Sequence, residues 1–481
     1  MKPRHWPAWI AGHAVTDGPS GTVTHPGDDS PVGTYTVPTA DQVEVAVASA
    51  HAVRKEAQAT TAAQRAAALT HGSNEIHRRL DEVAELITAE NGKPISLARV
   101  EATRAVATFR FAAEEARRFG GEVQRLDTEF SAAGRAAIIR RFPHGPVLGI
   151  SPFNFPLNLG AHKVAPAIAV GAPIVLKPAP ATPLSSLLLG EILSQTDLPE
   201  GMWSVLPVGN DVAPALVEDP RLPVVSFTGS EPVGFAIQAA VPRKHVLLEL
   251  GGNAAAIILE DYSSDADLEW AASRIAMFSN SQAGQTCVAV QRALVHESLV
   301  DRFIPLLTDK LKKLPNGDVW HPDTMVGPMI SVDAAKRVEE WVQEAVDMGA
   351  TVVVGGRRDG AFFEPTLLTG VTPACKVGSE EVFGPVMSIA TISSLDDAID
   401  IVNSSRFGLQ AGVFTHNIQM AFRAQRELEV GGVIVGDAPT YRADQMPYGG
   451  VKASGVGREG LRFAMNDYTH ERVMVLTGLD L

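Results

Sequence analysis

The first quarter of the chain passes from a polar, turn-rich opening into a long helical stretch. Residues 1–38 are rich in Gly, Pro, Thr and Asp, which favours short strands and turns. Thr39 and Gln42 form a capping-box signature ahead of an apolar and polar repeat typical of helices. The segment NGKP at 91–94 interrupts this repeat, because Gly and Pro at that spacing end one helix and open the next. The pattern predicts three or four amphipathic helices between 40 and 119.

After residue 121 the pattern changes to short apolar runs that alternate with helical periods. Strands are predicted at 136–142, 147–150, 173–176, 224–227 and 245–250, and helices at 183–195 and 233–240. The second half repeats this style, with strands at 289–295, 351–354, 385–391, 411–415 and 433–435 and helices at 265–278, 298–313, 332–348, 395–403 and 417–428. Such alternation predicts an α/β fold with parallel, helix-covered sheets.

Length and charge narrow the class of protein. A chain of 481 residues exceeds one ordinary core, so two or three domains are expected. Apolar residues make up 45% and charged residues 20%, which is a globular composition. The net charge of −14 argues against a general binder of nucleic acid or anionic membranes, which would show a basic surplus.

Cysteine usage and the N-terminus indicate the compartment. Two cysteines, Cys287 and Cys375, provide neither a disulfide framework nor a C-x-x-C metal site. No apolar signal-peptide core precedes Gly12, and no run reaches the roughly 18 apolar residues that span a bilayer. We expect a cytoplasmic protein without a bound metal.

Cys287 is the first candidate for chemistry. It lies in NSQAGQTCVAVQR at 280–292, among small and polar residues, whereas a structural cysteine usually lies in an apolar run. A nucleophilic thiol needs access to substrate and donors that favour the thiolate. This stretch alone is compatible with either a catalytic thiol or an unreactive free thiol.

Two further residues have unusual settings. Glu249 lies in the apolar strand HVLLEL, so it must be paired, protonated or facing a cleft, unless it points to solvent. Desolvation would raise its pKa and suit it to general-base work. Asn154 lies in the rigid PFNFP segment, where its amide is either a preorganised oxyanion donor or a turn former.

Three segments are candidates for binding an anionic cofactor. Gly229 and Ser230 follow a strand and open a helix, where free N–H groups favour a phosphate, although an ordinary turn looks the same. Lys177 ends a strand, where α/β sheets bind ligands, although a lone lysine there is often solvated. The formal G-x-G-x-x-G at 455–460 is rejected, because it lacks the strand and helix that the fingerprint requires.

Seven segments together resemble the aldehyde dehydrogenase superfamily in motif, order and rough spacing. They are PFNFP at 152–156, VLKPAPATP at 175–183, FTGSEPVG at 227–234, LELGGN at 248–253, GQTC at 284–287, EEVFGP at 380–385 and PYGGVKASGVGREG at 447–460. The resemblance covers nearly the whole chain. It implies NAD(P)-dependent oxidation of an aldehyde to the carboxylic acid.

The resemblance also implies catalytic roles. Cys287 would attack the aldehyde carbonyl, and the Asn154 amide and the Cys287 N–H would hold the resulting oxyanion. After hydride transfer, Glu249 would activate water to hydrolyse the thioester. Superfamily members that pass the acyl group to coenzyme A commonly lack this glutamate, so hydrolysis is favoured over the CoA-acylating alternative. Retention of all three residues argues against the other alternative, a non-catalytic binding protein.

Cofactor residues carry over in the same way. Lys177 matches the lysine that binds the adenosine ribose, Ser230 the pyrophosphate contact, and Glu381 and Phe383 the pair beside the nicotinamide ribose. Further cofactor positions implied by the resemblance are Ile150, Ser151, Phe153, Pro180 and Gly229. Pro180 departs from the pattern, since many NAD-preferring members carry glutamate there. Loss of that carboxylate removes repulsion toward a 2′-phosphate, so NAD and NADP are both expected to serve.

The substrate is the least constrained feature. The tunnel mouth would be lined by the loop 436–446, which looks like that of lactaldehyde- and phosphonoacetaldehyde-type members. Arg442, with Arg104 or Arg110, would bind an anionic tail, although a loop arginine is more often solvated. His162 stands near the position where succinate-semialdehyde enzymes place an arginine, which weighs against that substrate. A small hydroxylated or anionic aldehyde is expected.

The resemblance implies a Rossmann-like cofactor domain at 1–122 and 144–251 and a catalytic domain at 252–453. It also implies a small oligomerisation element at 123–143 and 454–481, which would pair between subunits by strand addition. A homodimer and a homotetramer are both open.

Overall fold

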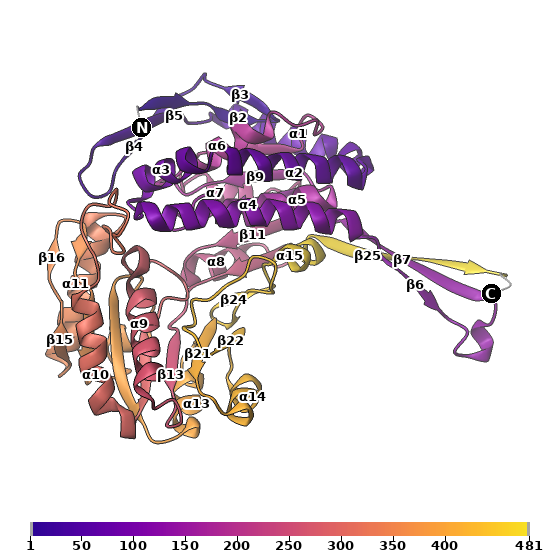
Figure 1. The fold of residues 1–481 in the computed structure, drawn as a ribbon. Coiled ribbons are helices and arrows are strands. Elements are labelled where there is room, and N and C mark those ends of the chain that lie inside the picture. Colours follow the sequence, from indigo (N-terminus) through magenta and orange to yellow (C-terminus); the bar gives the residue numbers. More distant parts are fainter. Residues whose placement is uncertain (1–2, 479–481) are drawn as a thin grey trace.

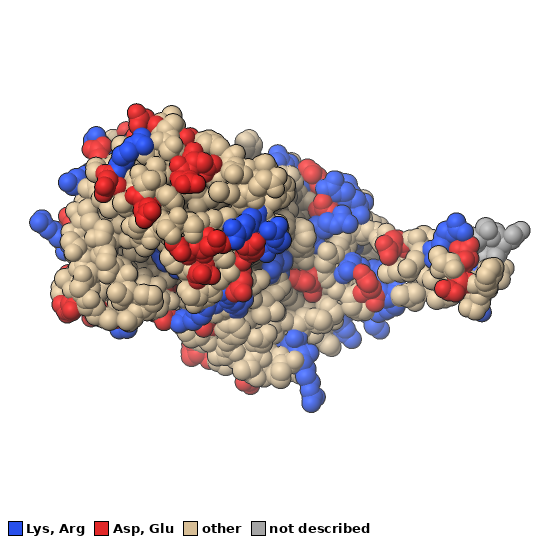
Figure 2. All heavy atoms as spheres, turned by 90° about the horizontal axis from the view of Figure 1, so that it is seen from below, with Lys and Arg blue, Asp and Glu red and all other residues tan. Residues whose placement is uncertain are grey.

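The computed structural model describes residues 3–478, so the last three residues of the predicted oligomerisation element lie outside the described residues. Most of the chain forms two lobes, each built on a large sheet, and an arm extends from the first lobe (Figure 1). On the face shown in Figure 2, acidic and basic side chains lie interspersed over the body. No helix within residues 3–478 has the length and apolar character needed to cross a membrane.

Four helices follow the N-terminal strands, as the sequence predicts. Thr39 caps the first helix and Thr61 the second, each in a capping box with the glutamine three residues later. Gly92 ends the third helix in a left-handed conformation with φ of 73°. The elements are β1 (Arg4–Trp6), β2 (Ala8–Ile10), β3 (His13–Val15), β4 (Ser20–Thr24), β5 (Pro31–Thr36), α1 (Ala40–Ala59), α2 (Ala62–Arg78), α3 (Leu80–Asn91) and α4 (Ile95–Arg118).

The first large sheet has the order β24-β12-β11-β8-β9-β10-β2-β3, and its five central strands are parallel. Helices α2 to α6 pack on one face around a large apolar core, and α1, α7 and α8 pack on the other. The elements are β8 (Val147–Ile150), α5 (Asn158–Val170), β9 (Ile174–Lys177), α6 (Leu184–Leu193), β10 (Trp203–Val205), α7 (Ala213–Glu218), β11 (Val224–Thr228), α8 (Glu231–Ala240), β12 (His245–Glu249), β24 (Gly455–Val456) and α15 (Leu461–Asp467).

The second sheet has the order β15-β18-β19-β14-β13-β21-β22, with only β15 antiparallel. Helices α9 and α10 cover one face, and α13 and α14 cover the other. The elements are β13 (Ala255–Ile258), α9 (Asp265–Asn280), β14 (Arg292–His296), α10 (Glu297–Lys312), α11 (Val332–Asp347), β15 (Thr351–Val354), β16 (Arg358–Asp359), β17 (Phe362–Phe363), β18 (Thr366–Thr369), α12 (Lys376–Ser379), β19 (Val386–Ile392), α13 (Leu395–Asn403), β20 (Phe407–Gly408), β21 (Gln410–Phe414), α14 (Ile418–Glu427), β22 (Gly432–Val435) and β23 (Val451–Lys452).

The arm is a three-stranded antiparallel sheet of β6 (Glu122–Arg125), β7 (Arg135–Pro143) and β25 (Thr469–Thr477), in the order β25-β7-β6. Of the predicted segment 454–481, only β25 joins this sheet. Strand β24 instead pairs with β12, and α15 packs against α4 and α5 of the first lobe. The arm is therefore smaller than the sequence predicts.

Some elements have no counterpart in the prediction. Helix α5 is buried along its whole length, so it has no polar face to reveal a helical period. Strand β13 is a run of only four apolar residues, which pattern alone does not separate from a buried helix. The strand expected at 289–295 begins only at Arg292, because residues 287–288 form a turn and residues 289–291 are irregular.

Candidate functional site

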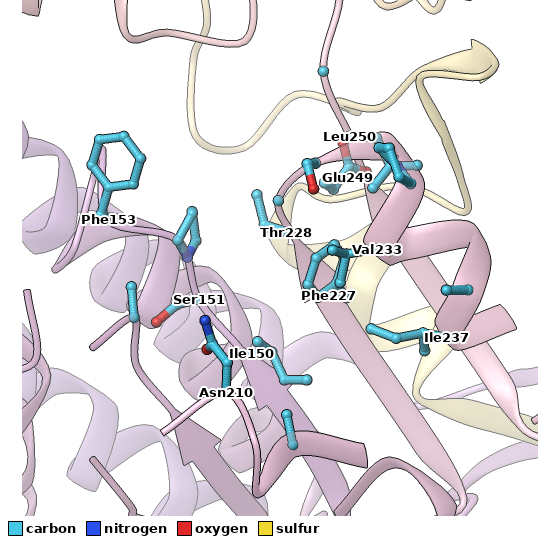
Figure 3. A pocket seen from close by; sticks show the side chains of 18 of the residues that line it. Ile150, Ser151, Phe153, Asn210, Phe227, Thr228, Val233, Ile237, Glu249 and Leu250 are labelled. Carbon is cyan, nitrogen blue, oxygen red and sulfur yellow. The ribbon is translucent and has the colours of Figure 1, made fainter. Parts of the chain in front are cut away.

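A cavity of about 840 Å³ opens at the carboxyl ends of the parallel strands of the first sheet. Its walls come from the segments that follow β8, β9, β11 and β12, and from α7 and α8. The second lobe contributes Cys287, Arg337, Glu381 and Phe383. In Figure 3, Ile150, Ser151 and Asn210 lie across the cavity from Val233, Ile237 and Leu250. The cavity lies where strand order reverses around β8, the usual ligand site of open α/β sheets.

The cavity gathers most of the residues singled out from sequence. Lining residues include the three candidate catalytic side chains and most cofactor positions: Asn154, Glu249, Cys287, Ile150, Ser151, Phe153, Lys177, Gly229, Ser230, Glu381 and Phe383. Pro180 is exposed one residue beyond the wall residue Ala179. His162, Arg442 and Arg110 do not line this cavity.

The backbone before Cys287 is held in an unusual conformation. Gln282, Ala283 and Gly284 all have positive φ, at 54°, 52° and 68°. A Cβ at position 284 would lie 2.1 Å from the Gly384 carbonyl oxygen, so only glycine fits there. Non-glycine residues in this region are strained, and such strain gathers at functional sites. The turn therefore fixes where the Cys287 thiol meets the cavity.

The Cys287 thiol is protonated in this environment. Burial raises its pKa to about 12, while a hydrogen bond with Tyr448 acts in the opposite direction. The Tyr448 hydroxyl lies 2.8 Å from Sγ. A thiol with this pKa needs a base to become a nucleophile. Cys375 differs, because it is fully buried in an apolar core and its thiol donates to the Thr372 carbonyl.

The backbone of Asn154 is anchored through its carbonyl oxygen. Its carbonyl oxygen accepts hydrogen bonds from Lys93 Nζ at 2.8 Å and from Gln282 Nε2 at 2.6 Å. Lys93 is in turn ion-paired with Glu101, and both side chains are buried. The Asn154 side-chain nitrogen donates to the Gln285 carbonyl at 3.0 Å, which leaves its second N–H for a ligand. This is the preorganised donor that an oxyanion requires.

Glu249 ends β12 and points into the cavity with 5% of its surface exposed. Burial raises its pKa well above the ordinary value, and the neighbouring Glu459 carboxylate adds to the effect. Oε2 has no partner within the described chain. A Cβ at Gly449 would lie 2.7 Å from Oε1, so this glycine makes room for the carboxyl group. Glu249 is thus a buried carboxyl group with a free oxygen, suited to general-base work.

The far end of the cavity fits an anionic dinucleotide. Lys177 Nζ donates to Asn210 Oδ1 at 3.0 Å, and burial lowers the lysine pKa to about 8. Ser230 is the N-cap of α8, and its side chain makes no capping hydrogen bond to that helix. A buried cation and a helix N-terminus together favour phosphate and ribose groups.

The opposite end of the cofactor region is lined by Glu381 and Phe383. Glu381 Oε1 accepts from the Gly252 N–H at 3.1 Å, and burial raises its pKa to about 8. Phe383 has a positive φ of 48° and contacts Phe153 edge-on, with ring centroids 5.8 Å apart. A carboxyl group suits a ribose hydroxyl, and two aromatic rings suit a flat ring. The lining therefore fits NAD or NADP.

The predicted substrate residues have different environments. Arg442 is buried rather than solvated: it pairs with Glu459 Oε2 at 3.0 Å and lies 3.9 Å above the Tyr448 ring centroid. His162 is buried against Asp444, with Nε2 3.0 Å from Oδ1. Arg104 also pairs with Asp444, at 2.8 Å. Arg110 does not match the prediction of a substrate contact. It is exposed on α4, its guanidinium lies over Phe111, and it does not line the cavity.

Several residues near the site were not predicted from the sequence to have a function. Tyr448 and Glu459 lie in the motif at 447–460, and the backbones of these two residues form a bridge to each other. Lys163 donates to Thr228 Oγ1 at 2.7 Å and lies 3.4 Å from Glu459 Oε1. Burial acts to raise the pKa of Glu459, but the Lys163 and Arg442 cations outweigh this effect and hold that pKa below its ordinary value. The rejected motif at 455–460 lies beside Glu249, and none of its residues lines the cavity.

The chain is similar to known proteins over nearly its whole length. The model of the aldehyde dehydrogenase family matches residues 14–474. The chain is 44% identical over 443 residues to 3-sulfolactaldehyde dehydrogenase from Priestia aryabhattai, covering 92% of this chain and 91% of that one.

Two solved structures are also closely similar. One is aldehyde dehydrogenase 21 from Physcomitrella patens in complex with the reaction product succinate, with a TM-score of 0.97 and 41% identity over all of both chains. The other is NADP-dependent glyceraldehyde-3-phosphate dehydrogenase from Bacillus halodurans complexed with NADP, with a TM-score of 0.93 and 32% identity, covering 98% of this chain and 99% of that one.

The family match spans nearly the whole chain, and the cavity presents a thiol, a carboxyl group and an amide donor beside a dinucleotide-sized space. The chain therefore belongs to the aldehyde dehydrogenase family and is an NAD(P)-dependent enzyme of that family.

Proposed function

We propose that this enzyme oxidises a small anionic aldehyde to the free carboxylic acid. The observation that carries the proposal is the buried Arg442 guanidinium, which lies over the Tyr448 ring close to the Cys287 thiol. One terminal nitrogen of Arg442 donates a hydrogen bond to Glu459 Oε2, and the Arg442 Nε has no partner within the described chain. A buried cation with a free donor near the nucleophile favours a substrate that brings its own negative charge.

The names of the similar proteins support an anionic substrate. The compounds in those names carry a sulfonate in 3-sulfolactaldehyde, carboxylates in succinate and a phosphate in glyceraldehyde-3-phosphate. The two named aldehydes also carry a hydroxyl group. The proposed substrate is therefore a short aldehyde with an anionic end group and a hydroxyl.

The chemistry follows from the residues of the cavity. Glu249 accepts the Cys287 thiol proton, Sγ bonds to the aldehyde carbon, and the oxyanion is held by the Asn154 amide and the Cys287 N–H. The nicotinamide of NAD(P), when bound, supplies the hydride acceptor that leaves a thioester on Cys287. Glu249 passes the thiol proton on to solvent before hydrolysis. It then takes a proton from water, the water oxygen attacks the thioester, and the acid leaves as the C–S bond breaks and the Cys287 thiolate is released.

Glu249 also helps to distinguish hydrolysis from the alternative reaction, in which coenzyme A accepts the acyl group. A buried carboxylate with a free oxygen favours attack by water on the thioester. We therefore expect acid to form without coenzyme A. Product that appears only when coenzyme A is added would contradict hydrolysis.

The test is a panel of anionic and neutral aldehydes assayed with wild type and Arg442→Gln. For the variant, we expect kcat/KM for anionic aldehydes to fall about 10- to 100-fold further than for neutral ones, since a hydrogen bond to a charged group contributes about 1.5–3 kcal/mol. The quantity to compare is the ratio of kcat/KM for anionic aldehydes to that for neutral aldehydes, because any effect of Arg442 on Tyr448 changes both values alike. Arg104→Gln is the matched control, since Arg104 pairs with Asp444 rather than with Glu459. An unchanged ratio would remove Arg442 from substrate recognition.

The same panel tests the cofactor. Position 180 carries proline, so no carboxylate at that position repels a 2′-phosphate, and we expect NADP to serve as well as NAD. A preference for NAD above about 100-fold in kcat/KM, roughly 2.7 kcal/mol, would contradict this inference.

We also propose that the enzyme is a homodimer or homotetramer of the cytoplasm. The arm carries exposed apolar side chains on β25, and its edge strands are open to strand addition. The free Cys287 and Cys375 thiols suit a reducing compartment.

A further inference from the structure

Tyr448 is the only side chain that forms a hydrogen bond with the Cys287 sulfur within the described chain. The contact of 2.8 Å does not depend on any bound group. Tyr448 is 4% exposed and packs with Val288 and Leu409 around Cys287. This tyrosine therefore touches the reacting atom, yet it has no role in the covalent chemistry described above.

The position of Tyr448 is fixed from two sides. Its backbone N–H donates to the Glu459 carbonyl at 3.0 Å, and its carbonyl accepts from the Glu459 N–H at 2.7 Å. The Arg442 guanidinium covers its ring, and the Glu459 side chain holds that guanidinium. A hydroxyl held in this way needs no reorganisation when charge develops on the sulfur.

We propose that Tyr448 is a further catalytic residue, whose O–H donates to Cys287 Sγ and stabilises the thiolate before attack and again when the sulfur leaves the thioester. The proposal rests on the proposed covalent chemistry of Cys287. Tyr448 gains and loses no proton: the thiol proton passes to Glu249, the S–C bond forms, and the carbonyl electron pair moves to oxygen. Once the sulfur is bonded to carbon it is a weak acceptor, and the hydrogen bond is released until the C–S bond breaks.

The donor role follows from the charges around the phenol. Burial raises the pKa of Tyr448 well above its ordinary value, and Cys287 adds to this effect. Tyr448 therefore keeps its proton at working pH and can act only as a donor to a thiolate. The cation over the ring draws electron density from the phenol, which strengthens the O–H as a donor.

The test measures alkylation of Cys287 by iodoacetamide as a function of pH, with no aldehyde or cofactor present. In Tyr448→Phe the thiolate loses a charge-assisted hydrogen bond, so its fraction at neutral pH should fall about 10- to 100-fold. The more basic thiolate is a better nucleophile, which returns about half of this loss on a logarithmic scale. We expect alkylation to slow about 3- to 10-fold and the pH profile to move to higher pH.

Three controls make the result specific. Tyr441→Phe changes an exposed tyrosine of the same loop and should leave alkylation unchanged. Cys287→Ser gives the background, because Cys375 is buried. Replacement of Tyr448 by 3-fluorotyrosine makes the phenol a stronger donor at nearly constant shape, so it should move the profile to lower pH. This second replacement also serves if Tyr448→Phe fails to fold.

An unshifted profile in both Tyr448 replacements would overturn the proposal. A merely structural disturbance would change the rate in the same direction in both replacements, whereas the proposal requires alkylation to slow with phenylalanine and to become faster with 3-fluorotyrosine. Because the assay contains no aldehyde, its outcome is independent of the proposed substrate. Failure of the aldehyde panel with opposite shifts in alkylation would overturn the proposed function alone.

Discussion

Glu249 shows how burial prepares a single residue for chemistry. In the proposed mechanism it acts as a base only when ionised, and burial together with Glu459 raises its pKa. The ionised fraction grows as pH rises through that raised pKa. Thioester hydrolysis should therefore increase with pH along a limb displaced above that of an ordinary carboxyl group.

The variant Glu249→Gln removes the base without changing the shape of the side chain. We expect steady-state kcat to fall about 10²- to 10⁴-fold, as for loss of a general base. Because Glu249 also accepts the thiol proton in the proposed mechanism, the single-turnover burst of NAD(P)H should slow as well, and added external base should restore this burst. Stopped-flow absorbance separates the two phases. A variant that keeps the wild-type kcat and pH limb would remove Glu249 from hydrolysis.

At the scale of elements, the loop between α3 and α4 contacts the backbone of the segment that carries Asn154. Lys93 in this loop joins Glu101 of α4 to the Asn154 carbonyl. Glu101 Oε1 also accepts from the N–H groups of Leu157 and Asn158, at 3.0 and 3.1 Å, where α5 begins. One ion pair thus fixes both the start of α5 and Asn154, the proposed oxyanion donor.

We predict that Glu101→Gln lowers the free energy of unfolding by about 3–5 kcal/mol, because it leaves the Lys93 ammonium buried without its counter-ion. Urea unfolding followed by tryptophan fluorescence measures this loss. The matched control is Glu75→Gln, which breaks a pair with the exposed Arg78 and should cost less than about 1 kcal/mol. Equal losses in the two variants would show that the buried pair does not hold this region.

At the scale of the whole molecule, the arm is the part that lacks a partner within one chain. Val473, Met474 and Val475 are consecutive in β25, and each is more than half exposed. Successive residues of a strand point to opposite faces, so both faces of β25 are uncovered. Apolar strands of this kind are covered in a stable assembly.

Val473→Glu should therefore shift the enzyme toward monomers, which light scattering after size exclusion would detect. The strand itself should persist, because β25 pairs with β7 over nine residues. Val45→Glu, at an exposed valine of α1, is the control and should leave the mass unchanged. A wild-type protein that is monomeric at micromolar concentration would contradict assembly through the arm.

Local patterns in the sequence determined the elements whose signals lie close together along the chain. The capping boxes at Thr39 and Thr61, the stop at Gly92 and the alternation of strands and helices depend only on near neighbours. The apolar setting of Glu249 left a buried and a solvent-facing carboxyl group both open, and the strand end at Lys177 left a ligand contact and a solvated lysine both open. The folded chain buries both side chains in the cavity wall. Helix α5 escaped prediction because burial on every side removes the polar face that gives a helical period.

Only the tertiary structure decided which distant groups meet. Arg442 looks like a solvated loop residue in sequence, but Glu459 and Tyr448 bury it. Tyr448 reaches Cys287 across 161 positions of the chain. In the strained turn, the Gln282 side chain likewise donates to two residues distant in sequence, Asn91 and Asn154. Sequence specifies side chains and local backbone preferences, whereas pKa, pairing and access depend on neighbours that only the folded chain brings together.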